Sequence, residues 1–288
     1  MKIKIEDEIY PNQLRKIPKP PKQLYLEGNI ELLNKPGIAI IGSRSCTKYG
    51  KKITEQISKE LAETGLVIIS GMAKGIDSFA HLGCISGNGS TIAVLPSGIN
   101  HIYPKENKNL YKKIIENGGL IVTEYDKQQQ ADSNKFLERN RIVSGLSIGI
   151  LVVEGGYRSG TSVTARLAKN QGKDIFCIPS SLENSKGITP NELIKQGAFL
   201  VTEAQDIINK YPNLKLERRE IESEEIDNID IKDEYKLIYN ILDKEKTIHI
   251  NEISKKCKSS IDEINYKLML LELEDKIISL PGNNYKRK

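Results

Sequence analysis

Short, unbroken apolar runs alternate with helical patterns along most of this chain, and this alternation restricts the fold more than any other feature. The first run, residues 38–41, is apolar at every position, as in a strand buried on both faces. Gly42 ends it, and Ile53, Ile57 and Leu61 follow at helical spacing. Further buried strands are predicted at residues 66–70, 91–95, 120–124, 148–154, 174–178 and 199–201. The pattern therefore predicts an α/β domain with a doubly wound, mainly parallel sheet.

Basic and glycine-rich segments come directly after several of these strands. Ligands of such sheets bind at the carboxyl ends of the strands, where Arg44, Lys74 and residues 96–98 and 155–161 are expected. The glycine-framed turn 42–50 leaves backbone N–H groups near a helix start that can hold an anion, and the Arg44 guanidinium matches a phosphate. The turn fits neither G-x-G-x-x-G nor G-x-x-x-x-G-K-S/T. A purely structural turn with Arg44 on the surface is an equal alternative.

The segment 154–165 resembles a phosphate-binding loop that lacks its lysine. Gly155 and Gly160 have the right offset, but Thr161 stands where the lysine would reach the β and γ phosphates. Triphosphate hydrolysis is therefore not expected. Glycines, hydroxyls and a helix start still suit a single phosphate of a nucleic-acid backbone. The plainer interpretation, Ser159 or Thr161 as an N-cap, is compatible with that role.

No catalytic or metal-binding pattern stands out. The three histidines, at positions 81, 101 and 249, lie in no zinc or nucleophile motif. Glu154 is the best single carboxylate, but one carboxylate is not an acid/base pair. The four cysteines are far apart, without a C-x-x-C pair, so neither disulfides nor zinc are expected. We expect no catalytic residue, no cofactor and no metal.

Charge and composition divide the 288 residues into parts. Residues 1–36 are rich in proline and lysine and are interpreted as an extended arm packed on the core. Residues 37–210 form the main domain, and residues 1–210 hold 28 Lys and Arg against 21 Asp and Glu, which suggests a polyanionic partner. Residues 211–232 read as an acidic linker. Residues 233–288 predict three helices and a hairpin, the order of a winged-helix module.

Neither a membrane span nor a signal peptide is evident in the sequence. No apolar run approaches 18 residues, and the N-terminus lacks the apolar region of a signal peptide. We therefore expect a cytoplasmic protein that does not associate with membranes. The small module is nearly neutral, which favours protein contacts over duplex DNA.

Taken together, these motifs resemble the DprA/Smf family, DNA processing protein A. The matching residues span positions 10 to about 208, and the tail resembles the family's C-terminal winged helix. The matching positions include Gly42-Ser43-Arg44 with Thr47 and Tyr49-Gly50, residues 70–77 with Ala80-His81, Ala93-Val94-Leu95 with Gly98, Tyr103-Pro104, Glu124, Phe136, residues 139–142, Val152-Val153-Glu154, Ser159-Gly160-Thr161 and Thr164-Ala165.

The resemblance implies an extended Rossmann-like domain in a non-enzymatic protein. Such a protein dimerises, binds single-stranded DNA without strong sequence preference, protects incoming DNA and helps load the RecA recombinase during natural transformation. A single-strand-binding protein is a further candidate partner. The DNA-binding residues that the resemblance implies are Gly42, Ser43, Arg44, Lys74, Lys135, Phe136, Arg139, Arg141, Ser159, Gly160 and Thr161.

Two departures from the family pattern concern local loop shape. Phe136 is followed by Leu137 instead of proline, and Pro179 by Ser180 instead of glycine. With no tryptophan and 6% aromatic residues, base stacking is expected to be limited, so that phosphate contacts dominate. Besides Phe136, the rings near the basic motifs are Tyr49, Tyr103 and Tyr157.

Two other functions compete with this one. The LOG-type phosphoribohydrolases, which act on nucleoside monophosphates, have a similar core and a Pro-Gly-Gly-x-Gly-Thr loop followed by a catalytic glutamate. Here residues 162–164 are Ser, Val and Thr where that carboxylate is expected, so the reaction has no evident base. The other alternative is an interaction scaffold in which the basic crevice is incidental.

Overall fold

The computed structural model describes residues 1–214, 216, 233–243, 246–257, 259–273 and 276–288. The chain forms two compact units, Met1–Glu220 and Ile221–Lys288. Most of the acidic linker predicted at 211–232 lies outside the described residues. Its first residues do not belong to a linker, because Tyr211 and Leu214 pack against the core of the larger unit.

The described part of the larger unit contains one sheet of nine strands in the order β1-β2-β6-β5-β4-β3-β7-β8-β9. Strands β3 to β9 run parallel to one another, whereas β2 pairs antiparallel with both β6 and β1. The strands are β1 (Lys2–Lys4), β2 (Gln23–Gly28), β3 (Gly37–Ile41), β4 (Val67–Ser70), β5 (Thr91–Val94), β6 (Leu120–Thr123), β7 (Gly149–Val152), β8 (Asp174–Cys177) and β9 (Phe199–Leu200). The prediction of a mainly parallel α/β sheet is confirmed.

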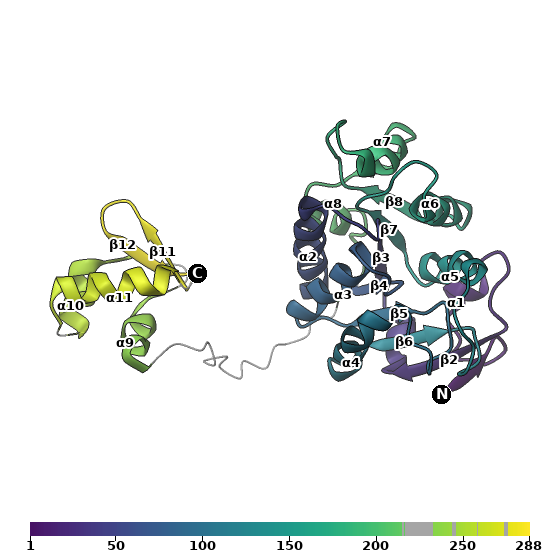
Figure 1. Ribbon diagram of the computed structural model, residues 1–288, viewed down its shortest axis with the longest axis horizontal. Helices are drawn as coiled ribbons and strands as arrows, with labels where there is room; N and C mark the ends of the chain where they lie inside the picture. Colours follow the sequence, from purple (N-terminus) through teal and green to yellow (C-terminus); the bar gives the residue numbers. More distant parts are fainter. Residues whose placement is uncertain (215, 217–232, 244–245, 258, 274–275) are drawn as a thin grey trace. The chain divides into compact units, whose positions relative to one another are not determined.

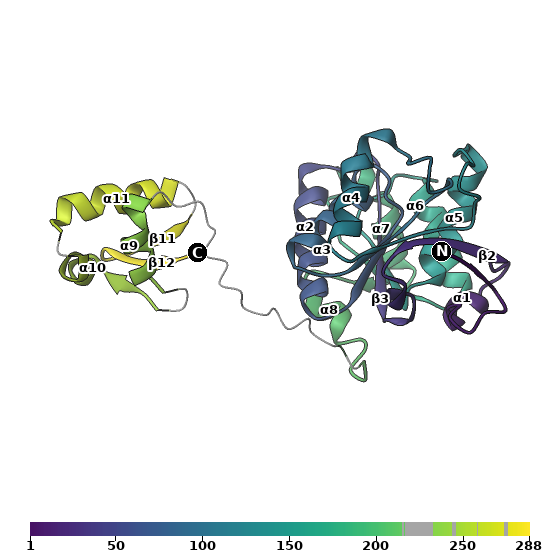
Figure 2. The same cartoon turned by 90° about the horizontal axis from the view of Figure 1, so that it is seen from below.

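Helices cover both faces of this sheet (Figures 1 and 2). Side chains of successive residues of a strand point to opposite faces, so Ile38 and Ile40 pack with the α2 side and Ala39 and Ile41 with the α5 side. One face carries α1 (Asn12–Arg15), α5 (Ser133–Gly145), α6 (Gly160–Asn170) and α7 (Ile188–Lys195). The other carries α2 (Lys48–Glu63), α3 (Ile76–Ser86), α4 (Lys108–Glu116) and α8 (Ala204–Ile208). The 3-10 turns are η1 (Ile30–Asn34), η2 (Lys105–Asn107) and η3 (Ser185–Gly187).

The predicted N-terminal arm is part of the sheet and not a segment laid upon it. Strand β2 pairs antiparallel with β6, where Leu26 lies opposite Val122. Tyr10, Leu14 and Leu24 are fully buried, and the Tyr10 hydroxyl donates to the Pro21 carbonyl at 2.8 Å. The prolines made this region look irregular, yet each stands outside the two strands and leaves their ladders intact.

The order of the strands reverses at β3. The chain proceeds from β3 through β4 and β5 to β6 on one side, and then β7 pairs with the opposite edge of β3. Crossovers therefore leave the carboxyl ends of β3 and β7 in opposite directions, which opens a crevice between the loops that follow Ile41 and Val152.

Within its described residues, the smaller unit contains the three helices and the hairpin expected from the sequence, and one further short strand, β10 (Ile248–His249), that was not expected. The elements in order are α9 (Asp233–Ile241), β10, α10 (Ile250–Cys257), α11 (Ile261–Leu273), β11 (Ile277–Leu280) and β12 (Asn284–Arg287). Its sheet has the order β10-β12-β11, and its core includes Ile253, Ile264 and Leu268. Assignment to the winged-helix class stays a prediction. In neither unit is any described helix long and apolar enough to cross a bilayer.

Candidate nucleic-acid interface

A pocket of about 430 Å³ opens at the carboxyl ends of β3, β4 and β7. It lies at the point where the strand order reverses, the usual ligand position in an open α/β sheet. Helix α5 closes one side of it through Arg139, Asn140 and Val143. The predicted DNA-binding residues that line the pocket are Gly42, Ser43, Arg44, Arg139, Ser159, Gly160 and Thr161.

The first turn, after β3, is held to the end of β7 by a buried carboxylate. Thr47 caps α2 by accepting a hydrogen bond from the Gly50 N–H at 2.9 Å. Glu154, which is 1% exposed, accepts from the Thr47 N–H at 2.9 Å and from its hydroxyl at 2.5 Å. A Cβ atom at Gly50 would lie 2.5 Å from the Glu154 carboxyl carbon, so only glycine permits this approach. Glu154 therefore shapes the turn that presents Arg44.

The second turn, after β4, has an unusual backbone conformation. Met72 is buried with φ of 53°, and Gly75 has φ of 76°. A non-glycine residue in the left-handed region costs about 1 to 3 kcal/mol and persists only where its surroundings hold it. Asp77 supplies part of this hold, because its Oδ2 accepts from the N–H groups of Gly71 at 3.2 Å and Ala73 at 3.4 Å.

Arg139 forms the floor of the pocket beneath that turn. It is 3% exposed, its Nη1 donates to the Val94 carbonyl at 2.6 Å, and its Nε has no protein partner. A Cβ at Gly71 would lie 1.8 Å from Nη1, so the backbone of the turn rests on the guanidinium. Burial lowers the pKa of Arg139 to about 10, which still leaves it charged at neutral pH. Burial raises the pKa of Asp77, and the nearby Arg139 charge opposes that rise.

An aromatic and cationic stack borders the pocket. The Arg44 guanidinium carbon lies 4.7 Å from the centroid of the Phe136 ring, and Tyr103 meets the same ring edge-on at 5.2 Å. Arg44 is exposed and Phe136 half-buried, so both are partly accessible to solvent. A guanidinium over a ring can hold a phosphate while the aromatic surface beside it takes a base.

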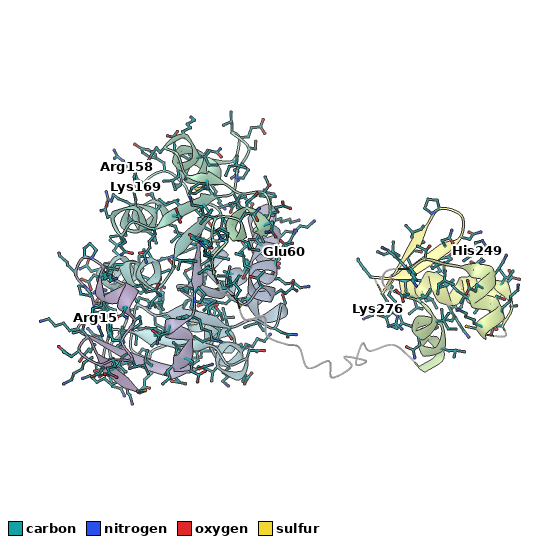
Figure 3. All side chains as sticks on the ribbon, turned by 180° about the vertical axis from the view of Figure 1, so that it is seen from behind. Arg15, Glu60, Arg158, Lys169, His249 and Lys276 are labelled. Carbon is teal, nitrogen blue, oxygen red and sulfur yellow. The ribbon has the colours of Figure 1, made fainter. Side chains whose placement is uncertain are left out.

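The start of α6 forms the opposite wall. Ser159 caps the helix by accepting from the Ser162 N–H at 3.4 Å, as the simpler interpretation predicts, and it also lines the pocket. The first N–H groups of a helix have no partner within it and carry its positive dipole end. A Cβ at Gly160 would meet nothing within 4 Å, so this wall is open to an approaching anion. Further out, Arg158 in the preceding turn and Lys169 in the last turn of α6 are exposed (Figure 3).

The two lysines among the predicted DNA-binding residues do not line the pocket. The Lys74 ammonium lies 2.6 Å from Glu106 Oε1, although the preceding residue, Ala73, does line it. Lys135 lies 2.8 Å from Asp132 Oδ2 and donates to the Gln130 carbonyl. Both cations therefore have carboxylate partners within the protein.

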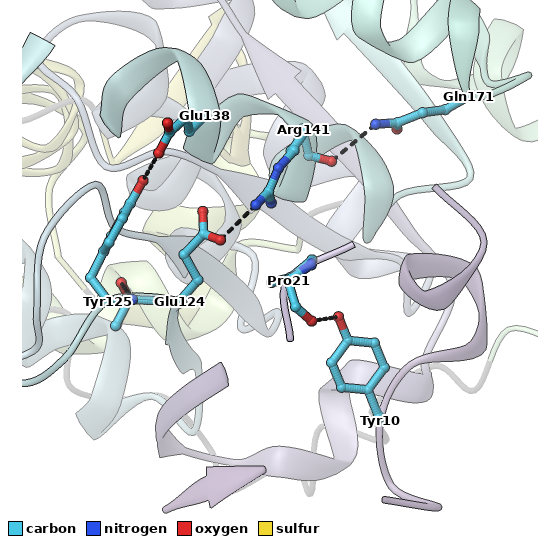
Figure 4. Close-up of polar contacts among 8 residues, drawn as sticks. Tyr10, Pro21, Glu124, Tyr125, Glu138, Arg141 and Gln171 are labelled. Atoms are coloured by element: carbon cyan, nitrogen blue, oxygen red, sulfur yellow. Dashed lines mark hydrogen bonds and ion pairs between the residues drawn. The ribbon is translucent and has the colours of Figure 1, made fainter. Parts of the chain in front are cut away.

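Arg141, also predicted to bind DNA, does not line the pocket. Its Nη2 lies 2.6 Å from Glu124 Oε2, and the pair is mostly buried beside the N-terminal segment (Figure 4). Residues two apart on a helix point to different faces, so Arg139 and Arg141 cannot both face the pocket. Arg141 instead anchors α5, with help from Glu138, which accepts a hydrogen bond from the Tyr125 hydroxyl at 2.9 Å.

Several residues that support the site carry no signal in the sequence. Asn107 donates to the Met72 carbonyl at 2.8 Å, and Glu106 holds Lys74, but both belong to a short 3-10 turn without a recognisable motif. The Lys186 ammonium donates to the Ser45 carbonyl across 141 residues of chain. Among the described residues, no group of three His, Cys, Asp or Glu side chains is arranged to hold a metal ion.

Comparison with known proteins identifies relatives of the larger unit. Residues 2–212 match the family model for DNA recombination-mediator protein A. The chain is 41% identical over 207 residues to DNA processing protein DprA of Streptococcus pneumoniae, covering 72% of this chain and 73% of that protein.

Two solved structures have the same fold. DprA from Streptococcus pneumoniae superposes with a TM-score of 0.70 and 40% identity, over 73% of this chain and 74% of the other. DNA processing protein A from Helicobacter pylori, described for its unique single-stranded DNA binding mode, superposes with a TM-score of 0.66 and 35% identity, over 74% and 96%. The Rossmann-like fold expected from the sequence is confirmed.

Proposed function

This chain belongs to the DNA recombination-mediator protein A family, and on that premise we propose that it binds single-stranded DNA in the pocket at the ends of β3, β4 and β7. The convergence of Arg44, Arg139 and the start of α6 on one cavity supports this function. Two guanidinium groups and free N–H groups suit the phosphates of a flexible strand, and Phe136 offers a ring to a base. The Helicobacter pylori relative, described for such binding, shares the fold.

The proposed function involves no covalent chemistry on the DNA. The carboxylate best placed to act as a base, Glu154, is buried and already accepts two hydrogen bonds from Thr47. Because both carboxylate oxygens of Glu154 already accept hydrogen bonds, Glu154 is poorly placed to act on a sugar, as the glutamate of the phosphoribohydrolase alternative must. Incubation with nucleoside monophosphates decides between the two, because release of free base at an enzymatic rate would establish the alternative.

The wider role proposed here is recombination mediation through a protein partner. We place the protein in the cytoplasm as a homodimer that protects incoming single strands and helps load RecA during natural transformation, with a single-strand-binding protein as a further partner. Assembly of RecA on strands coated with single-strand-binding protein, with and without this chain, tests the loading role. Sedimentation analysis tests the dimer, and a monomer at all concentrations would remove it from the proposal.

Replacing Arg44 by alanine is expected to weaken single-strand binding by about 1.5 to 3 kcal/mol, the usual contribution of a hydrogen bond to a charged group. The salt dependence of log K should become shallower by about 0.7, because one phosphate contact is lost. Fluorescence anisotropy with a labelled oligonucleotide at several salt concentrations measures both. Arg166→Ala is the matched control, since Arg166 is exposed on α6 and does not line the pocket. Equal behaviour of the two variants would remove Arg44 from the site.

Replacing Phe136 by alanine is expected to cost about 1 to 3 kcal/mol of binding free energy through the loss of one stacked base. The salt slope should change little, because no phosphate contact is removed. The contact between Phe136 and Arg44 adds a second expectation, that the effects of the two substitutions are not additive. The same titrations on both single variants and the double variant measure this. A fall in slope for Phe136→Ala as large as that for Arg44→Ala would show that the ring only holds the guanidinium.

A further inference from the structure

The 3-10 turn η2 (Lys105–Asn107) contacts the second pocket turn in two chemically different ways. Glu106 pairs with the Lys74 side chain, with 2.6 Å between Oε1 and Nζ. Asn107 instead holds the backbone, because its Nδ2 donates to the Met72 carbonyl at 2.8 Å. Both members of the ion pair are more than half exposed, so the pair can open without disturbing a packed core.

The backbone of the turn does not depend on Glu106. Besides the bond from Asn107, Asp77 accepts from the Gly71 N–H, and the Ser78 hydroxyl donates to the Ala73 carbonyl at 2.6 Å. These bonds maintain the conformation that brings Ala73 to the pocket. Removing the Glu106 carboxylate therefore frees the Lys74 ammonium and leaves the position of its main chain unchanged.

We propose that Glu106 is a positioning residue that competes with the bound strand for Lys74 and thereby sets the affinity and salt response of the site. This inference rests on the proposed single-strand binding. The lysine stem is flexible, and the residue before it lines the pocket, so the ammonium reaches either the carboxylate or a phosphate at the pocket edge. An exposed ion pair contributes little free energy, so the exchange is reversible.

The direction of the Glu106 pKa agrees with this competition. The hydrogen bond from Lys74 holds the pKa of the Glu106 carboxyl below its usual value, so Glu106 is ionised at neutral pH. In the free protein Lys74 is thus neutralised locally, and a strand gains its contact only by displacing Glu106. In the wild-type protein, Lys74 therefore adds less than one full charge to the number of phosphates that the protein neutralises on binding, and this number sets the salt slope.

The test is a set of oligonucleotide titrations by fluorescence anisotropy over a range of NaCl concentrations. Glu106→Gln is expected to bind about two- to fivefold more tightly at low salt, as the loss of an exposed ion pair allows. Its salt slope should become steeper by up to about 0.7, because Lys74 is then free for a phosphate. In a Lys74→Met background, Glu106→Gln should give no gain. Thermal unfolding should be the same for wild type and Glu106→Gln.

A matched control removes the same charge elsewhere. Glu63→Gln breaks the exposed pair with Lys59, where Nζ and Oε1 are 3.8 Å apart, at the far end of α2. The inference is overturned if Glu106→Gln behaves like Glu63→Gln, or if the gain persists in the Lys74→Met background, since either result shows a general charge effect. Wild-type protein that binds no oligonucleotide would overturn the proposed function itself and the inference with it, whereas normal wild-type binding with an unresponsive Glu106→Gln overturns the inference alone.

Discussion

Replacing Arg139 by methionine is expected to lower the free energy of unfolding of the larger unit by about 1 to 3 kcal/mol, the cost of leaving a buried hydrogen-bond acceptor without its partner. The substitution leaves the Val94 carbonyl without its donor and the buried Asp77 without its neighbouring cation. It also opens a gap beneath Gly71, whose backbone rests on the guanidinium. Urea unfolding followed by circular dichroism measures the change.

Two variants separate this explanation from a general effect of lost charge. Arg166→Met removes an exposed arginine of the same unit and should change stability by no more than about 0.5 kcal/mol. Asp77→Asn in the Arg139→Met background should recover part of the loss, because the neutral amide does not need the neighbouring positive charge that the buried carboxylate loses. A loss for Arg139→Met no greater than that for Arg166→Met would mean that the guanidinium does not support the pocket floor.

Acidification is expected to destabilise the larger unit through His81. This side chain is fully buried, and burial together with the Arg139 charge lowers its pKa from 6.5 to about 3. The Thr91 hydroxyl donates to the Ile68 carbonyl, so its oxygen accepts from His81 Nδ1 at 2.7 Å. The neutral ring therefore carries its proton on Nδ1, and a second proton on Nε2 would have no neighbouring group to accept its hydrogen bond.

The sign of the effect follows from the direction of this pKa shift. Between pH 6.5 and about 3 the unfolded chain binds a proton at His81 and the folded chain does not. The stability contributed by neutral His81 is complete above pH 6.5 and is lost as the pH falls through this window, by about 1.4 kcal/mol for each pH unit and about 4 to 5 kcal/mol in total.

A variant that lacks His81 separates this contribution from that of the carboxylates that titrate in acid. The free energy of unfolding of His81→Leu should depend less steeply on pH than that of wild type between pH 6.5 and 4. His101→Gln, which removes a partly exposed histidine, should keep the wild-type dependence. Parallel curves for wild type and His81→Leu over this range would contradict the assignment of buried, neutral His81.

How far the sequence predicts the site differs from one residue to the next. Gly42 and Ser159 were predicted at strand ends, and the structure places both at one pocket, because a parallel sheet gathers its carboxyl ends at one edge. Arg139 and Arg141 looked equivalent in the sequence. The helix turns them to different faces, where one supports the pocket and the other meets Glu124. Which of the predicted residues contact DNA stays a prediction.

The sequence by itself determined the alternation of strands and helices, the doubly wound α/β architecture and the positions of the glycine turns. These features depend on local periodicity and on the backbone conformations that neighbouring residues allow. Only the tertiary structure decided that residues 1–36 extend the sheet, that Arg139 is buried under Gly71 and that Glu106 holds Lys74. Each of these contacts is between segments that are far apart in the chain. They depend on the balance between the cost of removing charges from water and the contacts available after packing, which no local pattern contains.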